Sequence, residues 1–312
     1  DEAYAGARNF ERLQQAVNDV LGHTYVCPTH NVQGCVKLVA ATMVPAGSKL
    51  PSNARTRIDV LAPRSVEVPD VRDHAAELFT GNVDLGKLEE LLQGEDVAIV
   101  GLQAFADGQH PFSMENLRAV RALASRYGKQ LIMDGSRVIE NAWYIQRHEP
   151  GMGSHSIARL VKEIAKTAHV FQIDGAQDPK CPTGGLLVTD NPEDYEHFMN
   201  EVVVYEGLHT YGGMAGRTME VFARGLEEMC IEEEVQWVMQ QTEHFTERLQ
   251  NAGVPIERGC DGAYVLADEF FPHLDSFQQD AFSAALYEMS GVRAVAHGLV
   301  GRDNLVPVQI PR

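Results

Sequence analysis

The sequence predicts an α/β protein: a mostly parallel β-sheet flanked by helices, with a smaller α+β domain at the C-terminal end. Two observations carry this prediction. Short apolar segments alternate with amphipathic ones through most of the chain, and a long helical pattern follows them. Alternation of strands and helices is typical of parallel sheets, whose crossover connections are usually helical. Hydrophobic residues make up 44% of the 312 residues, enough for a sizeable core.

The elements are predicted from the spacing of apolar residues. Helices are predicted where these recur every three or four positions, over residues 10–21, 34–43, 84–92, 113–127, 156–167, 218–250 and 278–290. Strands are predicted where short apolar runs stand alone, over residues 24–27, 66–68, 97–102, 130–133, 170–173, 185–188, 264–267 and 292–295. The long helical pattern places a domain boundary near residue 235, giving a large α/β domain over 1–235 and a small α+β domain over 236–312.

Charge and cysteine content exclude several classes of protein. Lys and Arg number 26 against 44 Asp and Glu, so the net charge is −18 and general nucleic-acid binding is disfavoured. No apolar run is long enough for a membrane-spanning helix. The five cysteines are scattered, without a C-x-x-C motif, which favours reduced thiols in the cytoplasm over a disulfide framework.

Three loops are candidates for a ligand site, because open parallel sheets bind ligands beyond the carboxyl ends of their strands. These loops cover residues 28–34, 134–137 and 174–185. Asp134 directly follows a buried strand, so its carboxylate could accept a proton; the alternative is an Asp that caps the next turn and pairs with Arg137. His30 also follows a strand, either as a base or as an ordinary loop residue. No metal-ligand spacing and no phosphate-loop motif occurs.

A glycine- and aromatic-rich stretch covers residues 205–217, with the sequence Tyr-Glu-Gly-Leu-His-Thr-Tyr-Gly-Gly-Met-Ala-Gly-Arg. It resembles the tyrosine phenol-lyase and tryptophanase family, the fold-type I, pyridoxal-phosphate-dependent β-eliminating lyases. Further segments resemble the family in the same order: the initial Asp-Glu-Ala-Tyr-Ala-Gly, Pro-Thr-His at 28–30, Ser-Met-Glu-Asn-Leu at 113–117 and Gly-Val-Arg-Ala at 291–294. The resemblance covers nearly the whole chain.

The resemblance implies roles for several residues. Asp134 matches the Asp that bonds the cofactor's pyridine nitrogen, and Arg137 matches the Arg near its phenolic oxygen. Tyr4 matches an acid that acts across a subunit interface, which implies a homodimer or homotetramer. Arg293 and Arg312 match two arginines that face the substrate, and Arg312 would bind its carboxylate.

The cofactor-binding segments depart from the family pattern. A gapless pairing through Gly184-Gly185 places Gln177 where the family has its Schiff-base lysine, and an amide cannot bind an aldehyde covalently. The family's phosphate-binding Gln-Gly-Arg corresponds to Asn-Val-Gln at 31–33, residues 53–64 contain no aromatic residue, and Phe105 stands where the family has an Asn. The expectation is therefore that no cofactor is bound; pyridoxal phosphate (PLP) would require Lys180 in a rebuilt loop.

The function predicted from these residues is PLP-independent lyase chemistry, an elimination, hydration or cyclisation, on a small amino-acid-like or carboxylate substrate. Asp134 or His30 would act as base and Tyr4 as acid. The predicted substrate-binding residues are Arg293, Arg312, Tyr211, Phe105 and Gln177. The alternatives are a PLP-dependent β-eliminating lyase that uses Lys180, a non-catalytic paralogue that serves as a partner or binding subunit, and a metal-dependent enzyme with His30, Asp134 and His110.

Overall fold

The computed structural model describes residues 8–61, 65–68, 78–208, 213–294 and 305–309. The chain divides into two compact units. The first comprises Asp1–Ala106 and His110–Glu232, and the second comprises Asp107–Gln109 and Glu233–Arg312.

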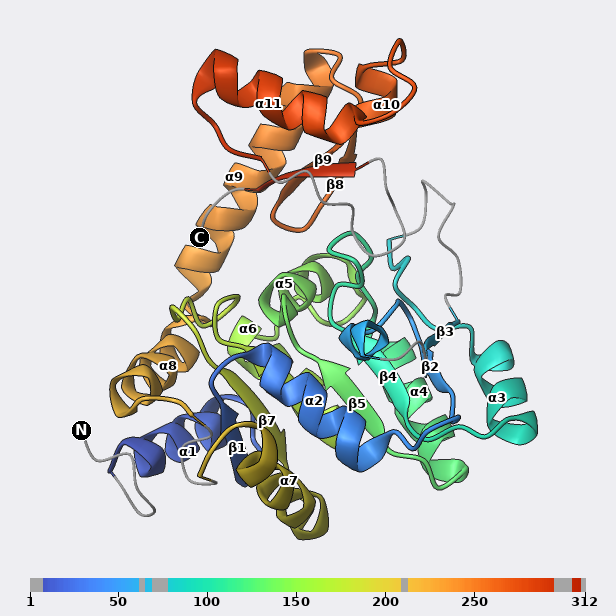
Figure 1. The fold of residues 1–312 in the computed structure, drawn as a ribbon, viewed down its shortest axis with the longest axis vertical. Coiled ribbons are helices and arrows are strands. Elements are labelled where there is room, and N and C mark those ends of the chain that lie inside the picture. The colour runs from blue at the N-terminus through green and yellow to red at the C-terminus, as the bar shows by residue number, and fades with distance from the viewer. Residues whose placement is uncertain (1–7, 62–64, 69–77, 209–212, 295–304, 310–312) are drawn as a thin grey trace. The chain divides into compact units, whose positions relative to one another are not determined.

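A mixed, mostly parallel sheet of seven strands forms the centre of the first unit (Figure 1). Its order is β1-β7-β6-β5-β4-β2-β3. The strands are β1 (Tyr25–Thr29), β2 (Leu50–Ser52), β3 (Ser65–Glu67), β4 (Val100–Gln103), β5 (Leu131–Asp134), β6 (Val170–Asp174) and β7 (Gly185–Thr189). Strands β2 to β6 pair in parallel, and β7 is antiparallel to both of its neighbours. The predicted fold class is confirmed.

Helices pack around this sheet. They are α1 (Arg8–Val20), α2 (Val32–Met43), the 3-10 helix η1 (Arg57–Val60), α3 (Leu85–Gly94), α4 (Met114–Arg126), α5 (Val138–His148), α6 (Ile157–Thr167), α7 (Pro192–Tyr205) and α8 (Gly216–Glu228). Helices α2 and α7 contact each other and β7, and α2 lies in front of the sheet in Figure 1. Buried side chains such as Val36, Leu38, Phe198 and Val202 fill the space between them, and burial of such side chains stabilises the layer.

The strand register brings several strand ends to one edge of the sheet. Because β1 and β6 are each antiparallel to β7, they run parallel to each other. Thr29 at the end of β1 and Asp174 at the end of β6 both lie opposite Gly185. Asp134 at the end of β5 lies beside Gln172 and Gln103. The carboxyl ends of four strands therefore meet at one edge, where ligands bind in open α/β sheets.

The second unit contains a three-stranded antiparallel sheet in the order β10-β9-β8. Its strands are β8 (Ile256–Arg258), β9 (Gly262–Leu266) and β10 (Leu305–Gln309), and its helices are α9 (Glu232–Asn251), α10 (Ala267–Phe270) and α11 (Gln278–Ser290). Val265, Phe282 and Val306 are buried in its core. This unit is the α+β part of the chain.

Some elements differ from the sequence prediction. The helical pattern at 218–250 is two helices, because α8 ends at Glu228 and α9 begins at Glu232. Helix α7, Pro192–Tyr205, has no counterpart among the predicted helices. Residues 292–294 form no strand, and residue 295 lies outside the described residues. Helix α5 and strand β10 also have no counterpart among the predicted elements.

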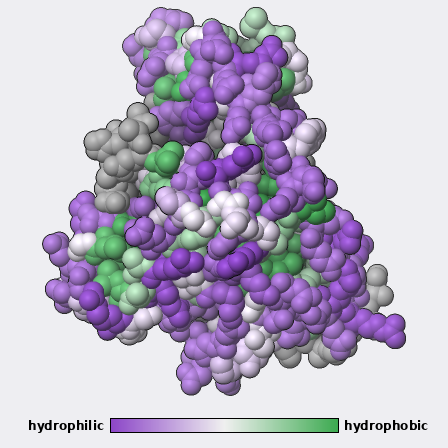
Figure 2. All heavy atoms as spheres, turned by 180° about the vertical axis from the view of Figure 1, so that it is seen from behind, coloured by the Kyte–Doolittle hydropathy of each residue, from purple (hydrophilic) through white to green (hydrophobic). Residues whose placement is uncertain are grey.

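The surface reflects the acidic composition of the chain. On the face drawn in Figure 2, hydrophilic residues predominate over hydrophobic ones. Within the described ranges, no helix is both long enough and apolar enough to cross a membrane.

Candidate functional site

Asp134 occupies the centre of the carboxyl edge of the sheet. It ends β5, and the chain turns sharply at Gly135, where a Cβ atom would lie 2.0 Å from the ring of Phe171. Asp134 Oδ1 accepts hydrogen bonds from the backbone N–H of Ser136 at 3.0 Å and from its hydroxyl at 2.7 Å. The side chain of Asp134 is 16% exposed. A short local turn thus fixes this carboxylate at the carboxyl edge of the sheet.

Arg57, the first residue of η1, lies between two strand-end carboxylates. Its Nε is 3.2 Å from Asp134 Oδ2, and its other guanidinium nitrogen, Nη1, is 3.6 Å from Asp174 Oδ2. Burial raises the pKa of Asp174, while the N–H of Ala176 and the charge of Arg57 lower it in part. The alternative that pairs Asp134 with Arg137 is therefore corrected: the ion pair at Asp134 is with Arg57.

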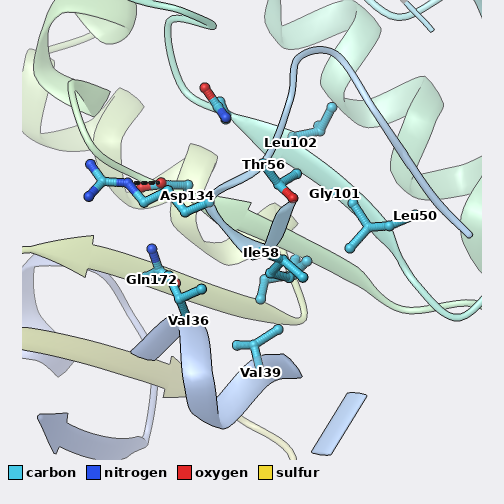
Figure 3. A pocket seen from close by; sticks show the side chains of 12 residues that line it. Val36, Val39, Leu50, Thr56, Ile58, Gly101, Leu102, Asp134 and Gln172 are labelled. Atoms are coloured by element: carbon cyan, nitrogen blue, oxygen red, sulfur yellow. Dashed lines mark ion pairs between the residues drawn. The ribbon is translucent and has the colours of Figure 1, made fainter. Parts of the chain in front are cut away.

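A small hollow of about 30 Å³ adjoins this carboxylate. Its polar side chains include those of Asp134, Gln172 and Arg57. Apolar side chains, among them Val36 and Val39 of α2, line another part of it, and Figure 3 shows these two valines on the side away from Asp134. The hollow therefore has a fixed carboxylate on one side and apolar side chains on the other.

The loop between β6 and β7 contains both Gln177 and Lys180. It begins after Asp174 and ends before Gly185, and backbone hydrogen bonds from Gln177 N to Asp174 O and from Lys180 N to Gln177 O form two successive turns. Gln177 is half-buried, whereas Lys180 is exposed and has a left-handed backbone with φ of 54°. The loop that leaves β6 therefore carries a lysine.

Asp178 in the same loop is fully buried and bonds to the start of α5. Its Oδ2 accepts a hydrogen bond of 2.7 Å from the backbone N–H of Arg137, the left-handed residue that precedes α5. Burial raises the pKa of Asp178 to about 7, although the N–H groups of Arg137, Val138 and Ile139 and the charge of Arg137 oppose the shift. Asp178 therefore ties the lysine-bearing loop to α5.

His30 follows β1 at the same edge and contacts Glu206, the residue after α7. His30 Nδ1 and the backbone N–H of His30 both bond to Glu206 Oε2. The side chain of Glu206 is 0% exposed and that of His30 is 50% exposed. The sequence contains no local signal for this contact, because the two residues are 176 positions apart.

The structure describes two of the remaining predicted site residues. Phe105 is buried and packs edge-on against Tyr144. Arg293 is exposed in the second unit. Tyr4, Tyr211 and Arg312 lie outside the described residues.

A metal site formed by three or more His, Cys, Asp or Glu side chains is not present among the residues that the structure describes. His30, Asp134 and His110 do not form such a group. His110 instead bonds through Nδ1 to the hydroxyl of Thr80 at 2.9 Å.

Comparison with known proteins decides the family. The model of the beta-eliminating lyase family matches residues 1–305. The chain belongs to this family. It is 35% identical to a tyrosine phenol-lyase of Nostoc punctiforme, over 97% of this chain and 69% of that protein. It is likewise 35% identical to a tyrosine phenol-lyase of Symbiobacterium thermophilum, over 100% of this chain and 75% of the relative, and 34% identical to one of Clostridium tetani.

The expectation that this lyase binds no cofactor is wrong. A family match over residues 1–305 and 35% identity to tyrosine phenol-lyases indicate PLP. The expectation depended on a gapless count back from Gly184-Gly185, which placed Gln177 at the lysine position. The loop between Asp174 and Gly185 also contains Lys180.

Proposed function

We propose that this chain is a PLP-dependent β-eliminating lyase, with Lys180 as the amine that binds the cofactor's aldehyde. The observation that carries the proposal is the carboxylate of Asp134, fixed at the carboxyl end of β5 beside a partly apolar hollow in a chain of this family. The substrate would be an amino acid that carries a leaving group on its β-carbon, as the name of the relatives suggests for tyrosine.

The residues present fit the ring and the aldehyde of PLP. A carboxylate is the group that bonds a protonated pyridine nitrogen, and Asp134 has one oxygen held by Ser136 and the other directed to a cation. The loop from β6 supplies the amine of Lys180. When bound, the cofactor supplies an electron sink that makes the substrate's α-proton acidic.

The chain's own residues have separate tasks in this proposal. Asp134 would hold the ring nitrogen of the cofactor once Arg57 releases Asp134 Oδ2. Asp174 lies 3.6 Å from Arg57 and could then hold the guanidinium. Lys180 would hold the cofactor's aldehyde, and its free amine would be the base for the substrate's α-proton. Asp178 keeps the Lys180 loop against α5.

Other parts of the proposal rest on the family resemblance. Arg293 and Arg312 remain proposed for the substrate carboxylate, Tyr4 as an acid and Tyr211 as a substrate contact. A homodimer or homotetramer in which Tyr4 serves a neighbouring subunit also remains a proposal.

The test is turnover by purified protein after it has been incubated with PLP and the free cofactor has been removed. The expected result is release of phenol from L-tyrosine or indole from L-tryptophan, each with pyruvate and ammonia, measured by chromatography. Lys180→Ala is expected to abolish turnover, whereas Lys37→Ala, which removes an exposed lysine of α2, is expected to retain it. A PLP-loaded protein that turns over neither amino acid, nor an S-substituted cysteine, would overturn the proposal.

A further inference from the structure

The proton positions on His30 are set by its two neighbours. The backbone N–H of Gly34 donates to Asn31 Oδ1 at 3.2 Å, so the amide nitrogen of Asn31 is the atom that faces the imidazole. That nitrogen lies 2.9 Å from His30 Nε2. An amide N–H₂ can only donate, so Nε2 must carry a lone pair and the ring proton must be on Nδ1. His30 Nδ1–H therefore donates to Glu206 Oε2.

The carboxylate of Glu206 is enclosed. Its side chain is fully buried, and its Oε1 has no hydrogen-bond partner among the residues that the structure describes. A Cβ atom on Gly34 would lie 2.6 Å from its carboxyl carbon, so a larger residue at position 34 would require the carboxylate to move. A buried carboxylate that holds an imidazole by Nδ1–H fixes the tautomer and stabilises the imidazolium once Nε2 takes a proton.

His30 also contacts the loop proposed to carry the reactive lysine. The hydroxyl of Thr183, three residues after Lys180, donates to His30 O at 2.7 Å. The imidazole is half exposed, so a proton can reach Nε2 if the amide of Asn31 gives way.

We propose that Asn31, His30 and Glu206 form a proton-accepting unit at the carboxyl edge of the sheet, in which His30 Nε2 is the accepting atom. Glu206 is a positioning residue that favours the imidazolium, and Asn31 is a positioning residue that favours the neutral ring. A proton that arrives at Nε2 displaces the Asn31 amide, while Nδ1–H stays on Glu206. This inference rests on the proposed function only for the reaction that such a base would serve.

Within the described residues, the charged group in contact with the imidazole is Glu206, at the end of α7. The thiols of Cys27 and Cys35 lie nearby, but burial raises the pKa of each, so they stay neutral at physiological pH. Separate substitutions of Glu206 and Asn31 therefore distinguish the effect of the Glu206 charge from that of the Asn31 amide on protonation of the His30 imidazole.

The test is the pKa of His30, measured by NMR titration of the imidazole signal that disappears in His30→Gln. Glu206→Gln removes the negative charge beside Nδ1 and is expected to lower this pKa. Asn31→Ser keeps an oxygen that caps α2 but removes the amide donor, and is expected to raise it. Glu196→Gln, at an exposed position of α7, is the matched control and is expected to leave it unchanged.

Shifts of the His30 pKa in opposite directions in Glu206→Gln and Asn31→Ser support the inference. Shifts in the same direction, or no shift, overturn it. Far-ultraviolet circular dichroism checks that each variant is folded; if Glu206→Gln does not fold, the rise in Asn31→Ser decides alone. The NMR titration does not require the protein to be catalytically active. Opposite shifts in a protein that fails to bind PLP would therefore contradict the proposed function and leave this inference standing.

Discussion

Two ends of parallel strands at the same sheet edge present ionisable groups in different ways. At the end of β5, Asp134 is held by Ser136, two residues away, and its side chain stays 16% exposed. At the end of β1, His30 is held by Glu206, 176 positions away, on a carboxylate that is completely buried. A local turn forms the environment of Asp134, whereas the fold brings Glu206 to His30. A partner two residues away therefore holds Asp134, whereas His30 depends on a partner that only the fold brings to it.

The largest expected effect is on the locally held carboxylate. Asp134→Asn keeps the size of the side chain but cannot hold a proton on the ring nitrogen, so kcat is expected to fall by about 100-fold or more. Ser136→Ala removes one of the two hydrogen bonds to Asp134 Oδ1 and leaves the backbone bond, so its loss is expected to stay below about 10-fold. Steady-state kinetics of both variants checks this. Equal losses would show that Asp134 acts only through its local turn.

The next effect concerns Asp178, a carboxylate with a distant partner. Its pKa is about 7 in the folded chain and near 3.8 when unfolded, so the folded state holds the proton more tightly between these values. Stability from this group is complete below about pH 4 and is lost as the pH rises towards 7, by at most about 4 kcal/mol. Denaturant unfolding at several pH values is expected to show this decline in the native chain and not in Asp178→Asn. If the free energy of unfolding depends on pH in the same way in the native chain and in Asp178→Asn, this prediction is wrong.

A smaller effect tests how tightly Glu206 is enclosed. Gly34→Ala places a methyl group against the Glu206 carboxyl and is expected to reduce the free energy of unfolding by about 1–3 kcal/mol. Gly94→Ala, at the end of α3 in open space, is expected to be neutral or to stabilise by about 0.5–1 kcal/mol. Thermal and denaturant unfolding measure both. The enclosure is contradicted if the two glycines tolerate alanine equally well.

The smallest effect is at Arg57, whose guanidinium is about one third exposed. Because solvent screens such pairs, Arg57→Gln is expected to change the free energy of unfolding by less than about 1 kcal/mol. Loss of the positive charge is expected to raise the pKa of Asp174 further, which NMR titration of the carboxyl groups measures. A lowered pKa of Asp174 would show that Arg57 does not act on it through its charge.

The part of the fold that the sequence predicts is the part governed by local patterns. The helix after Ser113 was predicted from its cap, and the Ser113 hydroxyl accepts the N–H of Asn116 at 3.1 Å. Helix α5 was missed because it begins at left-handed Arg137 without a side-chain cap of its own; Asp178, 41 positions later, accepts that residue's N–H. Strand β10 was missed because it exists through its pairing with β9.

The residues of the candidate site likewise divide into those with local signals in the sequence and those that only the fold brings together. Asp134 and His30 could be predicted because each directly follows an apolar strand. Arg57, Asp178 and Glu206 could not, because each reaches its partner through the fold: Arg57 meets Asp134 from η1, and Glu206 meets His30 from the end of α7. The expectation of no cofactor depended on the gapless placement of Gln177, and it is the family match over residues 1–305 that contradicts this expectation.

The central claim, that Lys180 binds the cofactor's aldehyde, is tested most directly by finding the labelled residue. Protein incubated with PLP is reduced with borohydride, digested, and its peptides are sequenced by mass spectrometry. The expected result is a stoichiometric pyridoxyl group on Lys180, absent in Lys180→Ala. A label on another lysine, or no label above that of a denatured control, would contradict the account.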